Sequence, residues 1–149
     1  MTKKIAAPKF TAAQFTPTQW DTSEVKAKFA NKLARFIIND FPETSFDNRF
    51  YQRLSMTFGH IAHYNRAGFY DAQFSDTRAK LSFIKQLVGY PCYGSPAFTY
   101  SDVEHEVRAW LLTSGVPARI EAQLAAEVAA AERAQLQRLM AKHPDVRAA

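Results

Sequence analysis

The sequence has a single cysteine, Cys92, among its 149 residues. One cysteine cannot form a disulfide within the chain, so we expect the reducing cytoplasm as its compartment. No apolar run approaches the roughly 20 residues that a membrane-spanning helix needs. The start, MTKKIAAPKF, is charged but lacks the apolar segment of a secretion signal. We therefore expect no signal peptide and no membrane association.

Most sequence signatures of enzymes are missing as well. There is no P-loop, no dinucleotide-binding glycine pattern, no serine elbow, and no HExxH or CxxC pair. No segment alternates with period two for long enough to predict a strand, and no internal repeat is visible. We therefore expect a protein without enzymatic activity that carries no metal ion and no other cofactor.

Aromatic residues, in contrast, are abundant. The chain contains 12 Phe, 6 Tyr and 2 Trp, more than one small core easily hides. Some of these rings could lie on the surface, where tyrosine and tryptophan favour contacts with a partner. The alternative is a core that is unusually rich in phenylalanine. The chain length is typical of one domain that folds alone.

Positive charge is concentrated in the first two thirds of the chain. Residues 1–100 hold 13 Lys and Arg against 7 Asp and Glu, a net +6, whereas residues 101–149 hold 6 against 7, a net −1. The total of +5 suits an anionic partner such as nucleic acid. The same charge could also serve solubility alone.

The pattern predicts a flexible basic arm over residues 1–19 and a helical domain over residues 20–149. The pairs KF, QF and QW could anchor the arm to the domain. The first helix is predicted at 22–40, where Asp21 and Glu24 have the spacing of a capping box and Trp20 that of a hydrophobic staple on Val25. Pro42 should end it.

Four further helices follow from the spacing of apolar residues. They are predicted at about 45–66, 76–88, 100–114 and 117–143. Gly68 should terminate the second, and Thr99 should cap the fourth, with Phe98 stapled to Val103. The sequence thus predicts an all-α fold, a single compact domain of about five helices. The alanine-rich last helix would allow close contact, within the fold or across a homodimer.

The candidate binding residues form two cationic stripes. Lys28, Lys32 and Arg35 recur at helical spacing on the first helix. The second helix carries Arg49 and Arg53, with His60 and His63 beyond them on the same stripe. Because Lys and Arg hold phosphates, we expect these faces to engage nucleic acid or a nucleoprotein complex. The ordinary alternative is a pair of solvated helix faces.

Two other functions remain open. The segment 89–100 holds Tyr90, Tyr93 and Tyr100 beside glycines, and tyrosine-rich loops make good protein-binding surfaces. This would suit a protein-directed inhibitor or adaptor, for example a mobile-element-encoded inhibitor of a host defence nuclease of the anti-CRISPR type. The second alternative is a small enzyme around His105 and Cys92, a histidine base beside a thiol.

Overall fold

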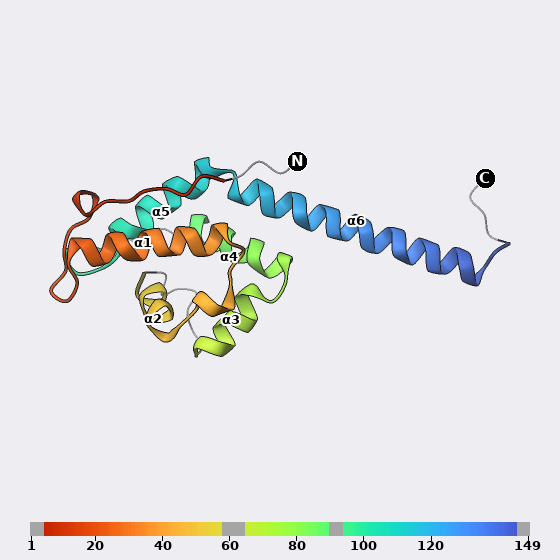
Figure 1. Ribbon diagram of the computed structural model, residues 1–149, viewed down its shortest axis with the longest axis horizontal. Coiled ribbons are helices and arrows are strands. Elements are labelled where there is room, and N and C mark those ends of the chain that lie inside the picture. The colour runs from red at the N-terminus through yellow and green to blue at the C-terminus, as the bar shows by residue number, and fades with distance from the viewer. Residues whose placement is uncertain (1–4, 58–64, 90–93, 146–149) are drawn as a thin grey trace.

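The computed structural model describes residues 5–57, 65–89 and 94–145 of the chain. The regular secondary structure of these residues is helical (Figure 1). None of these residues lies in a strand, so the predicted all-α class is confirmed. The α-helices are α1 (Ser23–Ile38), α2 (Asn48–Thr57), α3 (Arg66–Phe74), α4 (Thr77–Gly89), α5 (Ser101–Ser114) and α6 (Val116–Lys142), and the short 3-10 turns are η1 (Ala12–Gln14) and η2 (Glu43–Ser45).

Helix α1 starts one residue later than the sequence predicts. The side chain of Thr22, not Asp21, accepts the backbone N–H of Val25. Asp21 is turned inward instead, where it accepts hydrogen bonds from Tyr100 and Arg53. Trp20 is 73% exposed, so the predicted staple on Val25 is wrong.

Helix α1 ends in two consecutive left-handed residues, Asp40 (φ 65°) and Phe41 (φ 57°). The N–H of Phe41 bonds to the carbonyl of Phe36, and the N–H of Asp40 bonds to that of Ile37. These are the two hydrogen bonds of a Schellman motif, made here without glycine. The turn reverses the chain before Pro42 and buries the Phe41 ring.

The prediction of a single helix at 45–66 is wrong. It is replaced by η2, the shorter α2 and, after residues 58–64, the separate helix α3. Asp47 accepts the N–H of Phe50 at the start of α2. Asn65 caps α3 by accepting the N–H of Gly68, which therefore lies in the first turn of a helix. The glycine predicted to end one helix thus belongs to the start of another.

The core is rich in phenylalanine, as one of the two interpretations of the composition predicted. Phe74 lies at its centre, with its ring centroid 4.9 Å from that of Phe41 and 4.8 Å from that of Phe83. Ten of the twelve phenylalanines are buried among the described residues, namely Phe10, Phe15, Phe29, Phe36, Phe41, Phe46, Phe50, Phe69, Phe74 and Phe83. Phe74 stacks on Phe41 and meets Phe83 edge to face, and both arrangements add attraction to the burial of these rings.

The N-terminal segment is held against the domain from residue 5 onward, which corrects the expectation of a flexible arm. Ile5, Phe10 and Phe15 are buried. The side chain of Asn31 accepts the N–H of Phe10 and donates to its carbonyl, so it fixes this strand-like segment to α1. The KF and QF pairs are the anchors, and Trp20 of QW is not.

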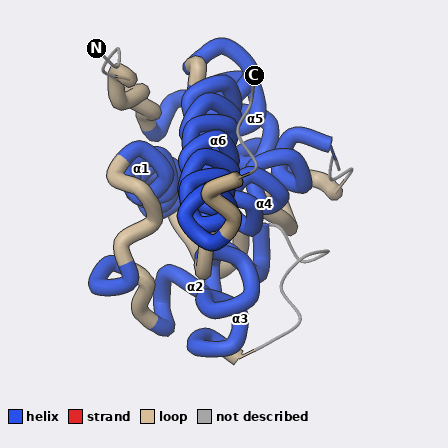
Figure 2. The backbone as a smooth tube through the Cα atoms, turned by 90° about the vertical axis from the view of Figure 1, so that its right-hand side faces the viewer, coloured by secondary structure: helices blue, strands red, loops and turns tan. Residues whose placement is uncertain are grey.

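Helix α6 belongs to the domain only at its beginning. Val116 and Ile120 are buried, Leu124 packs against the core, and Thr77 of α4 donates to Glu127. Beyond this point the helix projects from the domain as a long arm (Figure 1), which Figure 2 shows end-on. Its 27 residues span about 40 Å.

Candidate functional site

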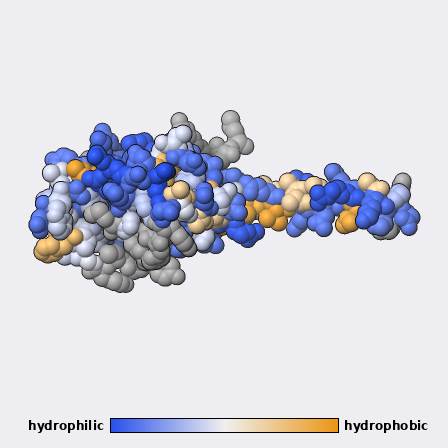
Figure 3. All heavy atoms as spheres, turned by 90° about the horizontal axis from the view of Figure 1, so that it is seen from below, coloured by the Kyte–Doolittle hydropathy of each residue, from blue (hydrophilic) through white to orange (hydrophobic). Residues whose placement is uncertain are grey.

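The two cationic stripes meet in one groove between α1 and α2. Lys28 and Lys32 line it from α1, and Arg49 and Arg53 line it from α2. The groove has a volume of about 350 Å³, and its floor includes Val25, Phe29 and Phe50. Figure 3 shows strongly hydrophilic surface on the face that carries these two helices.

Packing beneath the groove explains why the stripes converge. The rings of Phe29 and Phe50 lie 5.7 Å apart between their centroids, which joins α1 to α2. Lys28 and Lys32 are one helical turn apart, as are Arg49 and Arg53, so each pair follows its helix along the same side. Arg35 is exposed on α1 one turn beyond Lys32, outside the residues that line the groove.

One carboxylate lies among these cations. The Lys32 Nζ is 3.6 Å from an Asp47 carboxylate oxygen and 5.2 Å from the Phe50 ring centroid. The N–H of Phe50 donates to Asp47 and, with the nearby Lys32 ammonium, holds the pKa of this carboxyl below its usual value. Asp47 therefore remains ionised and partly neutralises Lys32.

The remaining cations differ in how strongly they are engaged. Lys28 and Arg49 are exposed and form no ion pair within the described part of the chain. Arg53 is 3.3 Å from Asp21, yet its buried Nε has no acceptor among the residues that are described. The groove thus offers two free charges, whereas the guanidinium of Arg53 is engaged with Asp21.

A buried polar network supports the groove from below. Tyr100 donates to Asp21 over 2.5 Å, and Asp21 also accepts from Arg53. Burial, together with the hydrogen bond that the Tyr100 hydroxyl donates to Asp21, raises the pKa of Tyr100 to about 12. Next to this, Lys26 is fully buried and donates to Asp102 at 2.9 Å and to two backbone carbonyls.

This network corrects one predicted binding residue. Tyr100 is only 1% exposed, so it cannot contribute to a protein-binding loop. Tyr90 and Tyr93 of the same prediction lie outside the described residues, as do His60 and His63 of the cationic stripe and Cys92. The groove is therefore lined by four of the predicted cations, Lys28, Lys32, Arg49 and Arg53, and the fifth, Arg35, lies outside it on α1.

The acidic cluster around His105 is occupied by structural contacts. Asp102 binds Lys26 and accepts the N–H of Thr16, and Glu106 accepts from Gln14. His105 itself is exposed. Within the residues that the structure describes, no three His, Cys, Asp or Glu side chains are grouped so that they could hold a metal ion.

Sequence reasoning missed two exposed aromatic residues. Phe98 is 71% exposed, so its predicted staple on Val103 is wrong, as is that of Trp20, 73% exposed. Both residues lie in loops that the buried network joins, since Tyr100 bonds to Asp21 and Lys26 bonds to the Pro96 carbonyl. No signal in the sequence separates these exposed rings from the buried ones.

No protein-family model, no curated protein and no solved structure is significantly similar to this chain. In the described part of the chain, no helix combines the length and the apolar character needed to cross a membrane.

Proposed function

We propose that this protein is a non-enzymatic binding protein of the cytoplasm that engages nucleic acid, free or within a nucleoprotein complex. The observation that supports this proposal is the shared groove, where four cations from two helices surround a space of about 350 Å³. A groove of this kind suits consecutive phosphates of a backbone, because Lys and Arg contact phosphates without regard to sequence.

These cations would play different roles, because some of them form ion pairs within the described part of the protein and others do not. Lys28 and Arg49, which are free of ion pairs in the described residues, would supply the main electrostatic attraction. Lys32 would exchange Asp47 for a phosphate, and Arg53, although paired with Asp21, would add positive charge beside it. Arg35 would extend the contact by one helical turn along α1. Because phosphate binding releases counterions, the affinity should fall steeply with salt.

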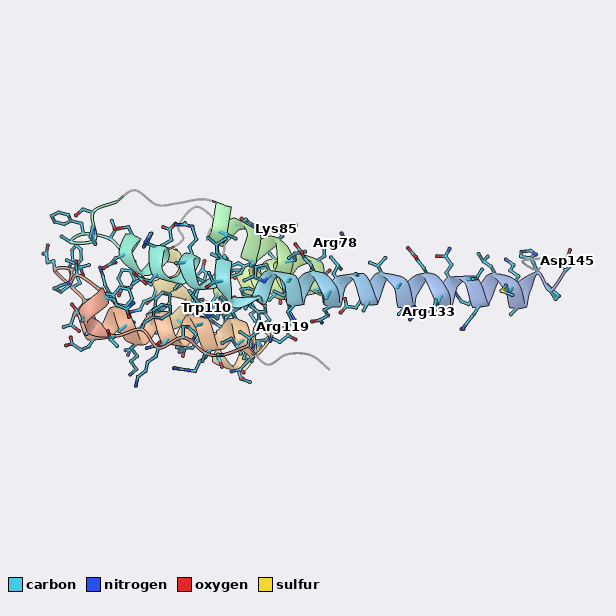
Figure 4. The ribbon with its side chains drawn as sticks, turned by 90° about the horizontal axis from the view of Figure 1, so that it is seen from above. Arg78, Lys85, Trp110, Arg119, Arg133 and Asp145 are labelled. Atoms are coloured by element: carbon cyan, nitrogen blue, oxygen red, sulfur yellow. The ribbon has the colours of Figure 1, made fainter. Side chains whose placement is uncertain are left out.

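The first test is fluorescence anisotropy with labelled duplex DNA, single-stranded DNA and RNA over a salt series. The double variant Lys28→Glu/Arg49→Glu should weaken binding strongly. It should also make the plot of log affinity against log salt less steep, by an amount that corresponds to the loss of about two phosphate contacts. The matched control is Arg78→Glu/Lys85→Glu, which makes the same charge change on α4, away from the groove. Figure 4 shows these two residues beside the base of α6.

Two results would contradict the proposal. One is the absence of binding by the unmodified protein even at low salt, about 50 mM. The other is an equal loss in the groove variant and the control variant, because net charge alone would then account for the binding. Circular dichroism of each variant shows whether the helices are retained.

A second candidate function is favoured by Trp20 and Phe98. Exposed aromatic residues in adjacent loops are typical anchors of protein-binding sites. They replace Tyr100 in the hypothesis of a protein-directed inhibitor or adaptor, for example one directed against a host defence nuclease. This function predicts that Trp20→Ala and Phe98→Ala reduce capture of the partner protein, whereas Lys28→Glu/Arg49→Glu does not.

A further inference from the structure

The projecting part of α6 exposes large apolar side chains. The exposed fraction is 39% for Val128, 57% for Leu136, 49% for Leu139 and 42% for Met140. From Ala125 to Lys142 no residue is buried. Helices in proteins gain most of their stability from packing one face against a neighbour. An arm of this length therefore has an apolar face that no described residue of the domain covers.

Leu136 and Leu139 of this face fall on the seven-residue spacing of a coiled coil, whereas Val128 and Met140 lie beside it. Residues 118, 122, 125, 129, 132, 136, 139 and 143 alternate at steps of four and three, the a and d positions of a heptad. We call these residues the seam. Ile120, which is buried in the domain, lies on the opposite side of the helix, at about 100° per residue. A second helix could therefore lie along the whole seam without displacing the domain.

Side-chain size along the seam is strongly asymmetric. The half nearest the domain presents Ala118, Ala122, Ala125 and Ala129, whereas the outer half presents Leu136 and Leu139. If two copies of α6 run antiparallel, Ala122 faces the partner's Leu139 and Ala125 faces the partner's Leu136. Every such layer then combines a small residue with a large one, which permits close packing. A parallel pair would place leucine on leucine and Glu132 on Glu132.

Charge, like side-chain size, differs between the two halves of α6 in a way that favours antiparallel pairing. Residues 117–132 carry one arginine and three glutamates, a net −2, and residues 133–142 carry three basic residues and no acidic one, a net +3. Antiparallel helices place the acidic half of each arm beside the basic half of the other, and parallel helices in register would oppose like charges. Arg133 marks the start of the basic half in Figure 4.

A groove at the base of α6 leaves room for the end of a second helix. It has a volume of about 1170 Å³ and runs between the N-terminal segment and α6, with Trp110, Ala118, Ala122 and Ala126 among its lining residues. Figure 4 shows Trp110 and Arg119 on this side of the helix base. In the antiparallel arrangement the outer end of the partner helix, with its exposed Met140, reaches this groove.

We propose that the protein forms a twofold-symmetric dimer in which α6 pairs antiparallel with α6 of a second copy along the seam. Such an interface uses the same surface of both chains and closes on itself, so it forms no filament. The dimer is independent of whether the groove between α1 and α2 binds a polyanion.

Sedimentation equilibrium of the full chain tests the oligomeric state. We expect a dimer whose dissociation constant rises about tenfold or more in Ala125→Glu, because the carboxylate would be buried against the partner's Leu136. The matched control is Ala130→Glu, the same change at an exposed position off the seam. A monomer at all concentrations would overturn the proposal, and so would equal effects of the two changes.

Cysteine cross-linking in a Cys92→Ser background tests the orientation. When Ala122→Cys and Leu139→Cys chains are mixed and oxidised, we expect disulfides between the two kinds of chain and few within either kind. Parallel pairing in register would instead join each kind to itself, and this result would rule out the antiparallel arrangement.

Discussion

At the scale of single residues, the fully buried Lys26 holds together segments of the domain that are distant in the sequence. Its ammonium donates to the carbonyls of Pro96 and Thr99 and to Asp102, all at 2.8–2.9 Å. These bonds attach the loop before α5 to α1. A buried charge is tolerated only when it is paired and fully hydrogen-bonded.

We expect Lys26→Met to destabilise the protein by about 3–5 kcal/mol, because it keeps the length of the side chain but removes the ammonium that pairs with Asp102 and donates to two carbonyls. Chemical denaturation measures the change. The control is Lys28→Met, two residues along on the exposed side of α1, which should alter the free energy of unfolding by no more than about 0.5 kcal/mol. Similar effects at both positions would show that the buried bonds contribute little.

Tyr100 gives a pH dependence with a definite sign. Its pKa is raised to about 12 in the folded protein, whereas an unfolded tyrosine ionises near pH 10. The stabilisation from its neutral hydroxyl is therefore complete below pH of about 10 and is lost as the pH rises towards about 12. We expect the stability difference between the unmodified protein and Tyr100→Phe to shrink over this range, measured by urea denaturation. A difference that stays constant with pH would mean that burial and the Asp21 contact do not raise the pKa of Tyr100 in the folded protein.

Single residues were also where sequence reasoning failed most often. Trp20, Phe98 and Tyr100 are aromatic residues near helix starts, and nothing in their sequence neighbours separates the buried ring from the exposed ones. Their positions depend on Lys26 and Asp21, which draw the two loops together over 70 residues or more of chain. Such contacts between distant segments are not encoded in local spacing.

At the scale of elements, the left-handed turn after α1 should respond strongly to side-chain shape. Asp40 has φ 65°, and its carboxylate is 3.0 Å from Lys80. Asp40→Gly and Asp40→Val both lose this ion pair, but only valine adds steric strain at positive φ. We expect the valine variant to be less stable than the glycine variant by about 1–2 kcal/mol. Thermal unfolding of the pair measures this, and equal stabilities would mean that the turn relaxes without cost.

The helices themselves were largely predictable, because each buries one face with regular spacing. The predicted segments 76–88, 100–114 and 117–143 match α4, α5 and α6 closely. The exception is the segment 45–66, where the apolar spacing continues from α2 to the separate helix α3. There the local hydrogen bonds of Asp47 and Asn65 decide where each helix begins, and Gly68 was mistaken for an end signal.

At the scale of the whole molecule, the sequence supplied the cations but not the groove. Lys28, Lys32, Arg49 and Arg53 were predicted as two separate stripes, and their convergence follows from the packing of Phe29 on Phe50. Helix α6 was likewise predicted from the spacing of its apolar residues, but only some of these residues contact the core. Ile120 and Leu124 contact the domain, whereas Val128 and Leu139 are exposed on the arm.

This division of α6 predicts that the domain folds without the arm. A chain ending after Ala131 keeps Val116, Ile120 and the Thr77–Glu127 hydrogen bond, and it loses no residue that is buried in the described structure. We expect it to retain its near-ultraviolet circular dichroism and to unfold with a midpoint that does not depend on protein concentration. In the same shortened chain, Ile120→Ala should cost about 2–5 kcal/mol, because it removes core contacts. Loss of the near-ultraviolet signal on truncation alone would mean that the outer helix is part of the folding unit.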